Sequence, residues 1–191
     1  MSRLVLCHLY PDLMSLYGDR GNIIALTQRA RWRQIEVEVI HHTIGGEADL
    51  AGVDLFFFGG GQDRQQITVS RHLQGATRRA LEAARDDGVV FLSICGGYQL
   101  LGHHFRTGQG DEIPGISLLD VTTVAGERRF IGDVVVECDE AALRRAVGLP
   151  VRSTSATRRT LVGFENHSGL TTLGAGAVPL GLMRVGCGNN G

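Results

Sequence analysis

The block Ser93–Gln99 (SICGGYQ) has the residue types of a nucleophile held on a tight turn. A cysteine thiolate attacks carbonyl carbons, and on a strand-to-helix turn it needs small neighbours because the backbone crowds its flanks. Gly96 and Gly97 provide that space directly after Cys95. The N–H groups that begin the following helix favour the thiolate form. The pattern predicts Cys95 as a catalytic nucleophile; the alternative is an unreactive structural cysteine beside a glycine turn.

A second glycine turn, Phe58–Arg64 (FGGGQDR), follows another apolar run. Consecutive glycines let backbone N–H groups approach a ligand closely, as an oxyanion hole requires. Plain turns and dinucleotide-binding loops also contain such glycines, although the spacing here is not G-x-G-x-x-G. Turns at the ends of two strands of one parallel sheet meet at the same sheet edge, so the two blocks are predicted to share a site.

Alternating strand and helix patterns in the first half must position these turns. Because parallel strands need crossover helices, this alternation predicts an α/β fold with a doubly wound, mostly parallel sheet and flanking helices. Short apolar runs indicate the strands, and a helical spacing of apolar residues indicates the helices. The strands are expected at Leu4–Leu9, Glu36–His41, Val53–Phe58 and Val89–Ile94, and the helices at Ile23–Arg33 and Arg71–Arg85.

The second half is predicted to add an antiparallel extension. Strands are expected at Ile116–Val124 and Phe130–Glu137, paired through the polar turn AGERR. A short helix at Glu140–Val147 and a polar loop at Leu149–Thr160 follow. Since no linker is visible, residues 1–191 are expected to form a single domain. The loop Tyr17–Asn22 is interpreted as a turn and helix cap, with a role near the site as the alternative.

Composition excludes several classes of protein. All 19 basic residues of the 191 are arginine, and without lysine there is no Schiff-base chemistry and no P-loop. The net charge of −1 with no basic run argues against nucleic acid as a partner. No apolar stretch is long enough to span a membrane, and no signal-peptide pattern is present. The four cysteines are scattered without a C-x-x-C pair, which predicts a cytoplasmic protein and no metal site.

Four sequence blocks carry a family resemblance. The motif CGGYQ at Cys95 resembles the nucleophile motif of class I (triad-type) glutamine amidotransferases. GFENHSG at Gly163–Gly169 is similar to the branch that includes the glutaminase domains of cobyric acid synthases. Together with YPDLMSLYGDRGNIIAL and FFFGGGQDRQQ, these blocks resemble the glutaminase subunits of lipid II isoglutaminyl synthases, from about Tyr10 to the final CGNNG.

The resemblance implies a reaction and roles for four residues. The Cys95 thiolate would attack the side-chain amide of L-glutamine, form a thioester and release ammonia. The backbone N–H groups of Gly60 and Gly96 would hold the oxyanion. Gln99 would help to orient the substrate.

The resemblance also implies a carboxylate-binding arginine and a histidine base. Arg129 matches the arginine that holds the carboxylate of glutamine, and Arg128 is its neighbour and rival. The family's catalytic histidine lies in a block after the Gly-Asn-Asn sequence, so the base is expected beyond Gly191. The alternative is that His167 acts as the base.

A synthetase partner is implied, because the chain has no P-loop. The resemblance makes it a Mur-ligase-like subunit in a heterodimer that uses ATP and Mg²⁺, with no cofactor in this chain. That subunit would amidate the D-glutamate α-carboxylate of lipid II to D-isoglutamine, so the chain would be cytoplasmic and peripheral at the inner membrane face through its partner. The alternatives are a glutaminase for cobyrinic or cobyric acid amidation in corrinoid synthesis, and an inactive binding or regulatory module.

Overall fold

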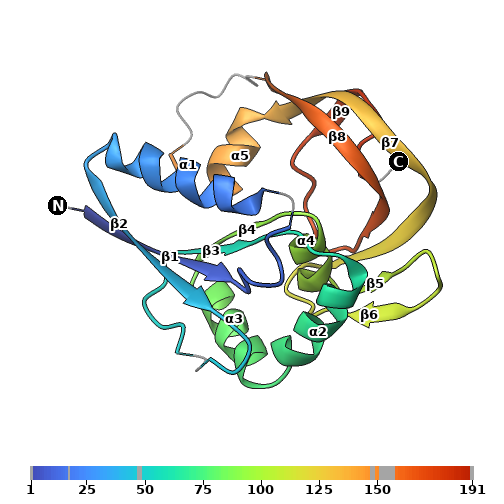
Figure 1. Ribbon diagram of the computed structural model, residues 1–191. Helices are drawn as coiled ribbons and strands as arrows, with labels where there is room; N and C mark the ends of the chain where they lie inside the picture. Colours follow the sequence, from blue (N-terminus) through green and yellow to red (C-terminus); the bar gives the residue numbers. More distant parts are fainter. Residues whose placement is uncertain (1, 17, 47–48, 147–148, 151–157, 190–191) are drawn as a thin grey trace. The chain divides into compact units, whose positions relative to one another are not determined.

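A parallel sheet with the strand order β2-β1-β3-β4 forms the centre of the first half of the computed structural model (Figure 1). The apolar run of β3 (LFFF) is buried, as expected for a strand covered on both faces. Its Phe56 is the register partner of Phe91, and the two rings stack with centroids 4.9 Å apart. The strands are β1 (Ser2–Leu9), β2 (Ile35–His42), β3 (Leu55–Phe58) and β4 (Val90–Ser93).

The structure describes residues 2–16, 18–46, 49–146, 149–150 and 158–189. They form two compact units, Met1–Leu119 and Asp120–Gly191. The expectation of a single domain stays a prediction. Within the described residues no helix is long and apolar enough to cross a bilayer.

Helices flank the sheet of the first unit on both faces. In Figure 1, α1 lies on one face and α2 and α3 lie on the other. The α1 face has a core of Leu6, Ile23 and Phe57, contributed by both strands and helix. The helices are α1 (Asp19–Arg31), α2 (Asp63–Leu73), α3 (Ala76–Asp86) and α4 (Gly96–Leu101).

The single helix predicted at Arg71–Arg85 is wrong, because the chain forms α2 and α3 there. α2 ends where Gln74 turns to an extended conformation, and Gly75 follows with φ 76°, which favours glycine, directly before α3 begins. The periodicity of apolar residues continues across the break, which is why the sequence pattern does not reveal it.

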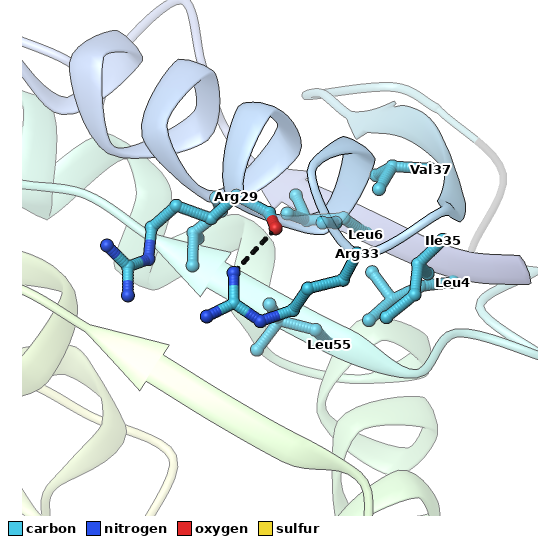
Figure 2. A pocket seen from close by; sticks show the side chains of 9 residues that line it. Leu4, Leu6, Arg29, Arg33, Ile35, Val37 and Leu55 are labelled. Carbon is cyan, nitrogen blue, oxygen red and sulfur yellow. Dashed lines mark hydrogen bonds between the residues drawn. The ribbon is translucent and has the colours of Figure 1, made fainter.

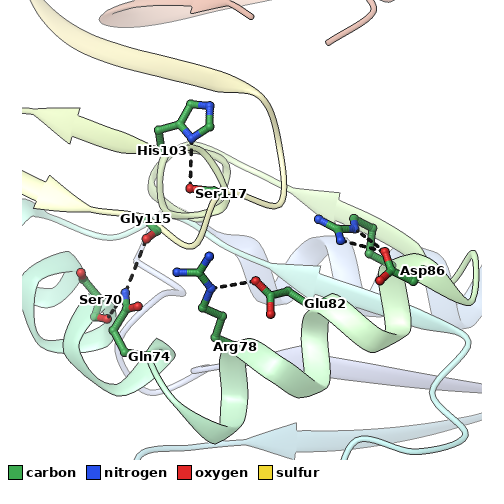
Figure 3. Close-up of polar contacts among 9 residues, drawn as sticks. Ser70, Gln74, Arg78, Glu82, Asp86, His103, Gly115 and Ser117 are labelled. Carbon is green, nitrogen blue, oxygen red and sulfur yellow. Dashed lines mark hydrogen bonds and ion pairs between the residues drawn. The ribbon is translucent and has the colours of Figure 1, made fainter. Parts of the chain in front are cut away.

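Side-chain hydrogen bonds tie the α2–α3 corner to the segment that follows α4 (Figure 3). Gln74 donates to the carbonyl oxygen of Gly115 over 3.5 Å, and Ser70 donates to that of Pro114 over 2.5 Å. Pro114 ends β6 (Glu112–Pro114), which pairs antiparallel with β5 (His104–Arg106). The helices that flank the sheet are therefore fixed to the hairpin that follows the predicted nucleophile.

The second unit is an antiparallel sheet around one long strand. β7 (Val121–Asp139) pairs with β8 (Arg158–Leu173) and with β9 (Leu182–Val185). The helix α5 (Glu140–Ala146) follows β7, as predicted up to its last residue, which lies outside the described residues. Residues 151–157 of the predicted loop also lie outside them, and its last residues begin β8.

The predicted turn AGERR is wrong, because these residues continue within β7. The pairing of β7 with β8 shifts register between Ala125 and Phe130, so an irregularity absorbs the polar residues and the strand continues. The broader expectation is confirmed: a parallel sheet with flanking helices is followed by an antiparallel extension.

Candidate active site

Cys95 lies on a strained turn between β4 and α4. Its backbone has φ 53° and ψ −116°, a combination that residues with side chains rarely adopt. The strand ends at Ser93, and the helix begins at Gly96. The thiol is exposed. A sharp strand–turn–helix that presents its side chain at the edge of a parallel sheet is the geometry of a nucleophile elbow.

The two glycine turns meet at this edge, as predicted. The N–H of Gly97 donates to the carbonyl oxygen of Gly59 over 3.0 Å, and that of Ile94 donates to Phe58 over 2.8 Å. A Cβ at position 97 would lie 2.5 Å from the carbonyl oxygen of Phe58, closer than any real side chain comes. Glycine at 97 is therefore required for the two turns to approach each other.

Gly96 is equally crowded. A Cβ there would lie 2.9 Å from the side chain of Gln66 and 3.1 Å from the terminal methyl of Met14. As the first residue of α4, Gly96 has an N–H group with no partner inside the helix. That group meets the requirement for an oxyanion donor beside Cys95, and its catalytic role stays a prediction.

The backbone N–H of Gly60 already has a hydrogen-bond acceptor inside the protein, which the sequence does not reveal. It donates to Oδ2 of Asp19 over 3.1 Å, and Asp19 is 2% exposed. A Cβ on the preceding Gly59 would lie 2.8 Å from the carboxyl carbon of Asp19, so the aspartate packs directly on the glycine turn. The Gly60 N–H becomes available to an oxyanion only when that hydrogen bond breaks.

Neither Asp19 nor Gln66 is singled out by the sequence. Asp19 lies in the loop Tyr17–Asn22, and its hydrogen bond to Gly60 agrees with the alternative interpretation of that loop, a role near the site. The available signal was its place in the loop after β1, at the same sheet edge as Cys95. The buried Gln66 donates to the carbonyl oxygen of Gly61 over 3.1 Å, and its own amide oxygen has no hydrogen-bond partner within the described residues. No sequence pattern distinguishes such a glutamine in advance.

Gln99 lies one helical turn after Cys95, where its backbone N–H donates to the Cys95 carbonyl oxygen over 3.1 Å. Its side chain is half-buried. The structure therefore brings four predicted residues, Cys95, Gly60, Gly96 and Gln99, to one edge of the first unit.

The other cysteines differ from Cys95 in exposure. Cys7 is buried in β1, and burial raises the pKa of its thiol to about 12, which keeps it protonated. Cys138 is also buried, whereas Cys187 is exposed. Exposure alone separates Cys95 and Cys187 from the remaining thiols.

Arg129 and Arg128 belong to the second unit. Nε of Arg129 donates to the side-chain oxygen of Asn166 over 2.6 Å. The Arg128 guanidinium lies 4.5 Å from the centroid of the Phe130 ring, a cation–π contact. Because Arg129 is anchored through Nε, its terminal nitrogens keep the fork geometry that binds a carboxylate. The substrate-binding role stays a prediction.

His167 makes contacts within the second unit through both ring nitrogens. Its Nδ1 lies 3.1 Å from the carbonyl oxygen of Gly169, and its Nε2 lies 3.5 Å from Oε2 of Glu165. Both ring nitrogens therefore lie near oxygen atoms of the second unit. The alternative in which His167 acts as the base stays a prediction.

Glu165 holds the turn that follows β9. Its carboxylate accepts hydrogen bonds from the backbone N–H groups of Cys187 and Gly188, each over 2.9 Å. These two bonds and His167 hold the pKa of Glu165 below its usual value, although partial burial opposes them. Glu165 of the GFENHSG block thus has a structural function in the second unit.

A separate cavity of about 300 Å³ lies between α1 and the sheet. Figure 2 shows the Arg33 guanidinium turned back to the carbonyl oxygen of Arg29, a hydrogen bond of 2.8 Å. The lining is mostly aliphatic and includes none of the predicted site residues. The cavity is therefore distinct from the site at Cys95.

Comparison with known families agrees with the resemblance seen in the sequence. The model of the CobB/CobQ-like glutamine amidotransferase domain matches residues 5–191. A solved structure described as a glutamine amidotransferase superposes with a TM-score of 0.53 and 15% identity, covering 97% of this chain and 80% of the other. At that identity the superposition shows the fold alone. The predicted fold class and family resemblance are confirmed.

Curated relatives point to one branch of that family. The lipid II isoglutaminyl synthase (glutamine-hydrolyzing) subunit GatD of Staphylococcus aureus (strain N315) is 38% identical over 190 residues, covering 100% of this chain and 70% of the relative. The GatD of Streptococcus pneumoniae (strain ATCC BAA-255 / R6) is 34% identical over 189 residues, which cover 98% of this chain and 66% of that relative. The cobyric acid synthase of Pelotomaculum thermopropionicum is 39% identical over 111 residues, 53% of this chain and 19% of that protein. The chain spans about two thirds of the length of its GatD relatives.

Proposed function

This chain belongs to the CobB/CobQ-like glutamine amidotransferase domain family, and we propose that it is the glutamine-hydrolysing subunit of an amidating ligase. The observation that carries the proposal is the exposed Cys95 on its strained turn, hydrogen-bonded through its neighbours to a second glycine turn. A thiolate nucleophile beside backbone N–H donors is the arrangement that acyl transfer from an amide requires.

In the proposed reaction the Cys95 sulfur forms a bond to the side-chain amide carbon of glutamine, and the carbonyl oxygen becomes an oxyanion. The N–H of Gly96 donates to that oxygen. Collapse of the intermediate breaks the carbon–nitrogen bond, and the nitrogen leaves as ammonia after gaining a proton. Water then hydrolyses the thioester to glutamate and returns the thiol. The position of the base stays the prediction made from the sequence.

Gly60 would join the oxyanion hole only by exchanging partners. Its N–H donates to Asp19 in the present structure, so a developing oxyanion competes with a carboxylate for the same donor. Such a site favours the intermediate once the carboxylate moves away from Gly60. Arg129 is proposed to bind the α-carboxylate of glutamine through its terminal nitrogens, and Gln99 to orient the substrate.

The ammonia is proposed to pass to a Mur-ligase-like synthetase that binds ATP and Mg²⁺ and amidates the D-glutamate α-carboxylate of lipid II. The proposal rests on the two GatD relatives, which match 100% and 98% of this chain. The complex would act on the cytoplasmic side, at the inner face of the membrane. The second candidate acceptor is a cobyrinate-type carboxylate, favoured by the 39% identity to a cobyric acid synthase over 53% of the chain.

The test is co-expression of the chain with the Mur-ligase-like synthetase of the same genome, followed by assays of glutamate release and of lipid II amidation by mass spectrometry. We expect glutamate release that disappears in the Cys95→Ser variant and amidated lipid II that requires both subunits and ATP. Release that is unchanged in Cys95→Ser rejects the nucleophile. Amidation of cobyrinate instead of lipid II selects the second candidate.

A further inference from the structure

The buried side chain of Gln66 lies between the two glycine turns of the candidate site. It is 2% exposed and belongs to the start of α2, the helix that follows the turn Gly59–Gly61. In Figure 1, α2 lies beside α4, the helix that follows Cys95, and the two helices are in contact. A side chain near the start of α2 can therefore reach both glycine turns.

Gln66 holds the turn Gly59–Gly61 by a hydrogen bond. Its Nε2 donates to the carbonyl oxygen of Gly61 over 3.1 Å. The neighbouring carbonyl oxygen, that of Gly60, accepts from the N–H of Leu16 over 3.4 Å. Because glycine backbone adopts many conformations, a run of three glycines keeps one conformation only through partners outside itself. Gln66 is such a partner on the side of α2.

The same amide packs against Gly96, the proposed oxyanion donor beside Cys95. A Cβ at position 96 would lie 2.9 Å from both Cδ and Nε2 of Gln66. Met14 fills the adjacent space, because its terminal methyl would lie 3.1 Å from that Cβ and its Sδ 2.5 Å from a Cβ at Gly61. The Gln66 amide thus contacts one turn by a hydrogen bond and the other by packing. Its length therefore helps to set the separation of the two turns.

The amide oxygen of Gln66 is buried and has no hydrogen-bond partner within the described residues. A buried acceptor without a donor costs free energy, and an apolar side chain of the same length would avoid that cost. Packing alone therefore favours a residue such as methionine at this position. What the amide adds is the hydrogen bond to Gly61, so the reason for a glutamine here lies in how it holds the turn.

We infer that Gln66 is a positioning residue for the oxyanion hole: its hydrogen bond to Gly61 and its packing on Gly96 fix the spacing of the two turns that carry the proposed donors. The inference rests on the proposed function for the reaction in which those donors act. The role assigned to Gln66 operates through the backbone of the turns, not through contact with the reacting atoms. Donors that are held in place stabilise a developing oxyanion without reorganisation, and a misplacement of about 1 Å can cost about 100-fold in rate.

The first test measures steady-state glutamate release by the full chain in complex with the Mur-ligase-like synthetase. Gln66→Met should lower kcat by about 10-fold or more and leave KM within about twofold, because an oxyanion hole acts only in the transition state. Gln66→Leu is the second variant, with a shorter side chain. Gln65→Met is the matched control: it makes the same substitution at the next residue of α2, whose amide oxygen also has no partner within the described residues, and should leave kcat unchanged.

The second test separates the oxyanion donors from the reactivity of the thiol. When the Cys95 thiolate adds to a glutamine-like chloroketone, the ketone oxygen becomes an oxyanion, whereas a neutral alkyl halide reacts by direct displacement and forms none. Gln66→Met should therefore slow the modification of Cys95 by the chloroketone by about 10-fold or more and leave the rate with the alkyl halide unchanged. A role in packing alone would change both rates or neither. Peptide mass spectrometry in a Cys187→Ser background measures the two rates.

A lower kcat and a slower chloroketone reaction in the Gln66 variants, with Gln65→Met behaving as the unmodified chain does, support the inference. If the Gln66 variants release glutamate at the unmodified rate while Cys95→Ser does not, the inference is wrong and the proposed function stands. If the unmodified complex releases no glutamate, the proposed function falls and the inference falls with it. If circular dichroism shows that both Gln66 variants are unfolded, or if KM rises while kcat is unchanged, Gln66 serves the fold or substrate binding and the inference is overturned.

Discussion

At the scale of single residues, reactivity in this chain is decided by backbone conformation and exposure. Cys95 and Cys7 are the same residue type, yet Cys95 is exposed on a strained turn and Cys7 is buried in β1. Burial raises the pKa of the Cys7 thiol to about 12, so it stays protonated at neutral pH.

We therefore expect selective labelling of Cys95. In a Cys187→Ser background, which removes the other exposed thiol, a glutamine-like chloroketone should modify Cys95 at least tenfold faster than a neutral alkylating reagent of similar size does. Peptide mass spectrometry measures the site and the rate. Modification of Cys7 or Cys138 at a comparable rate in the folded protein would contradict the assignment.

Asp19 gives a second prediction for single residues. Removing its carboxylate leaves the buried N–H of Gly60 without its acceptor, which costs about 1–3 kcal/mol. Asp19→Ala should lower the free energy of unfolding by this amount in urea denaturation. Arg20→Ala, at the next and exposed position, is the control and should change it by less than about 0.5 kcal/mol. Equal effects of the two substitutions would show that the hydrogen bond from Gly60 to Asp19 does not contribute to the free energy of unfolding.

At the scale of elements, the sequence predicts what local periodicity and glycine placement determine. Apolar runs followed by glycines predict the strands that carry the two glycine turns. They also predict that the two turns meet at one sheet edge. The break at Gly75 does not follow, because the apolar periodicity is the same on both sides of it. The local sequence also does not predict that β7 continues through the residues between Ala125 and Phe130. Polar residues there are compatible both with a turn and with an irregularity inside a strand. The sequence does not single out Asp19 within the loop Tyr17–Asn22, because its contact with Gly60 joins loops far apart in the chain.

The contact between the glycine turns predicts the effect of one methyl group. Gly97→Ala places a Cβ 2.5 Å from the carbonyl oxygen of Phe58, so the turns must separate. We expect a loss of about 1–3 kcal/mol in unfolding free energy. Gly21→Ala is the matched control, because a Cβ there meets nothing within 4 Å inside α1 and should stabilise by about 0.4–1 kcal/mol. If Gly97→Ala leaves the free energy of unfolding unchanged, the two glycine turns are not in contact in solution.

At the scale of the whole molecule, the described residues divide into two units with different predicted roles. The first contains the predicted nucleophile and oxyanion donors, and the second contains Arg129, the predicted substrate-binding residue. Within the second unit, Glu165 connects β8 to the turn after β9 through two backbone N–H groups. Part of the stability of that unit therefore comes from one ionised carboxylate.

This carboxylate gives the second unit a pH dependence. A carboxyl whose pKa is lowered on folding contributes stability above its unfolded value, about 4.3, and loses that contribution as the pH falls through the folded value. Glu165→Gln should therefore be less stable than the unmodified chain at pH 7, and the difference should shrink as the pH falls below about 4. Chemical denaturation across this range measures it, with Glu127→Gln, at an exposed position of β7, as the matched control. If the difference in stability between Glu165→Gln and the unmodified chain does not change with pH, the substitution acts through packing and not through the charge of Glu165.

The backbone at Cys95 has an evolutionary consequence. A side chain at φ 53° and ψ −116° carries a conformational cost that glycine does not, so selection for ammonia production and selection for a stable fold favour different residues at this position. A lineage that stopped hydrolysing glutamine would gain stability by replacing Cys95 with glycine. The predicted role of Cys95 as nucleophile would account for a cysteine in this costly conformation.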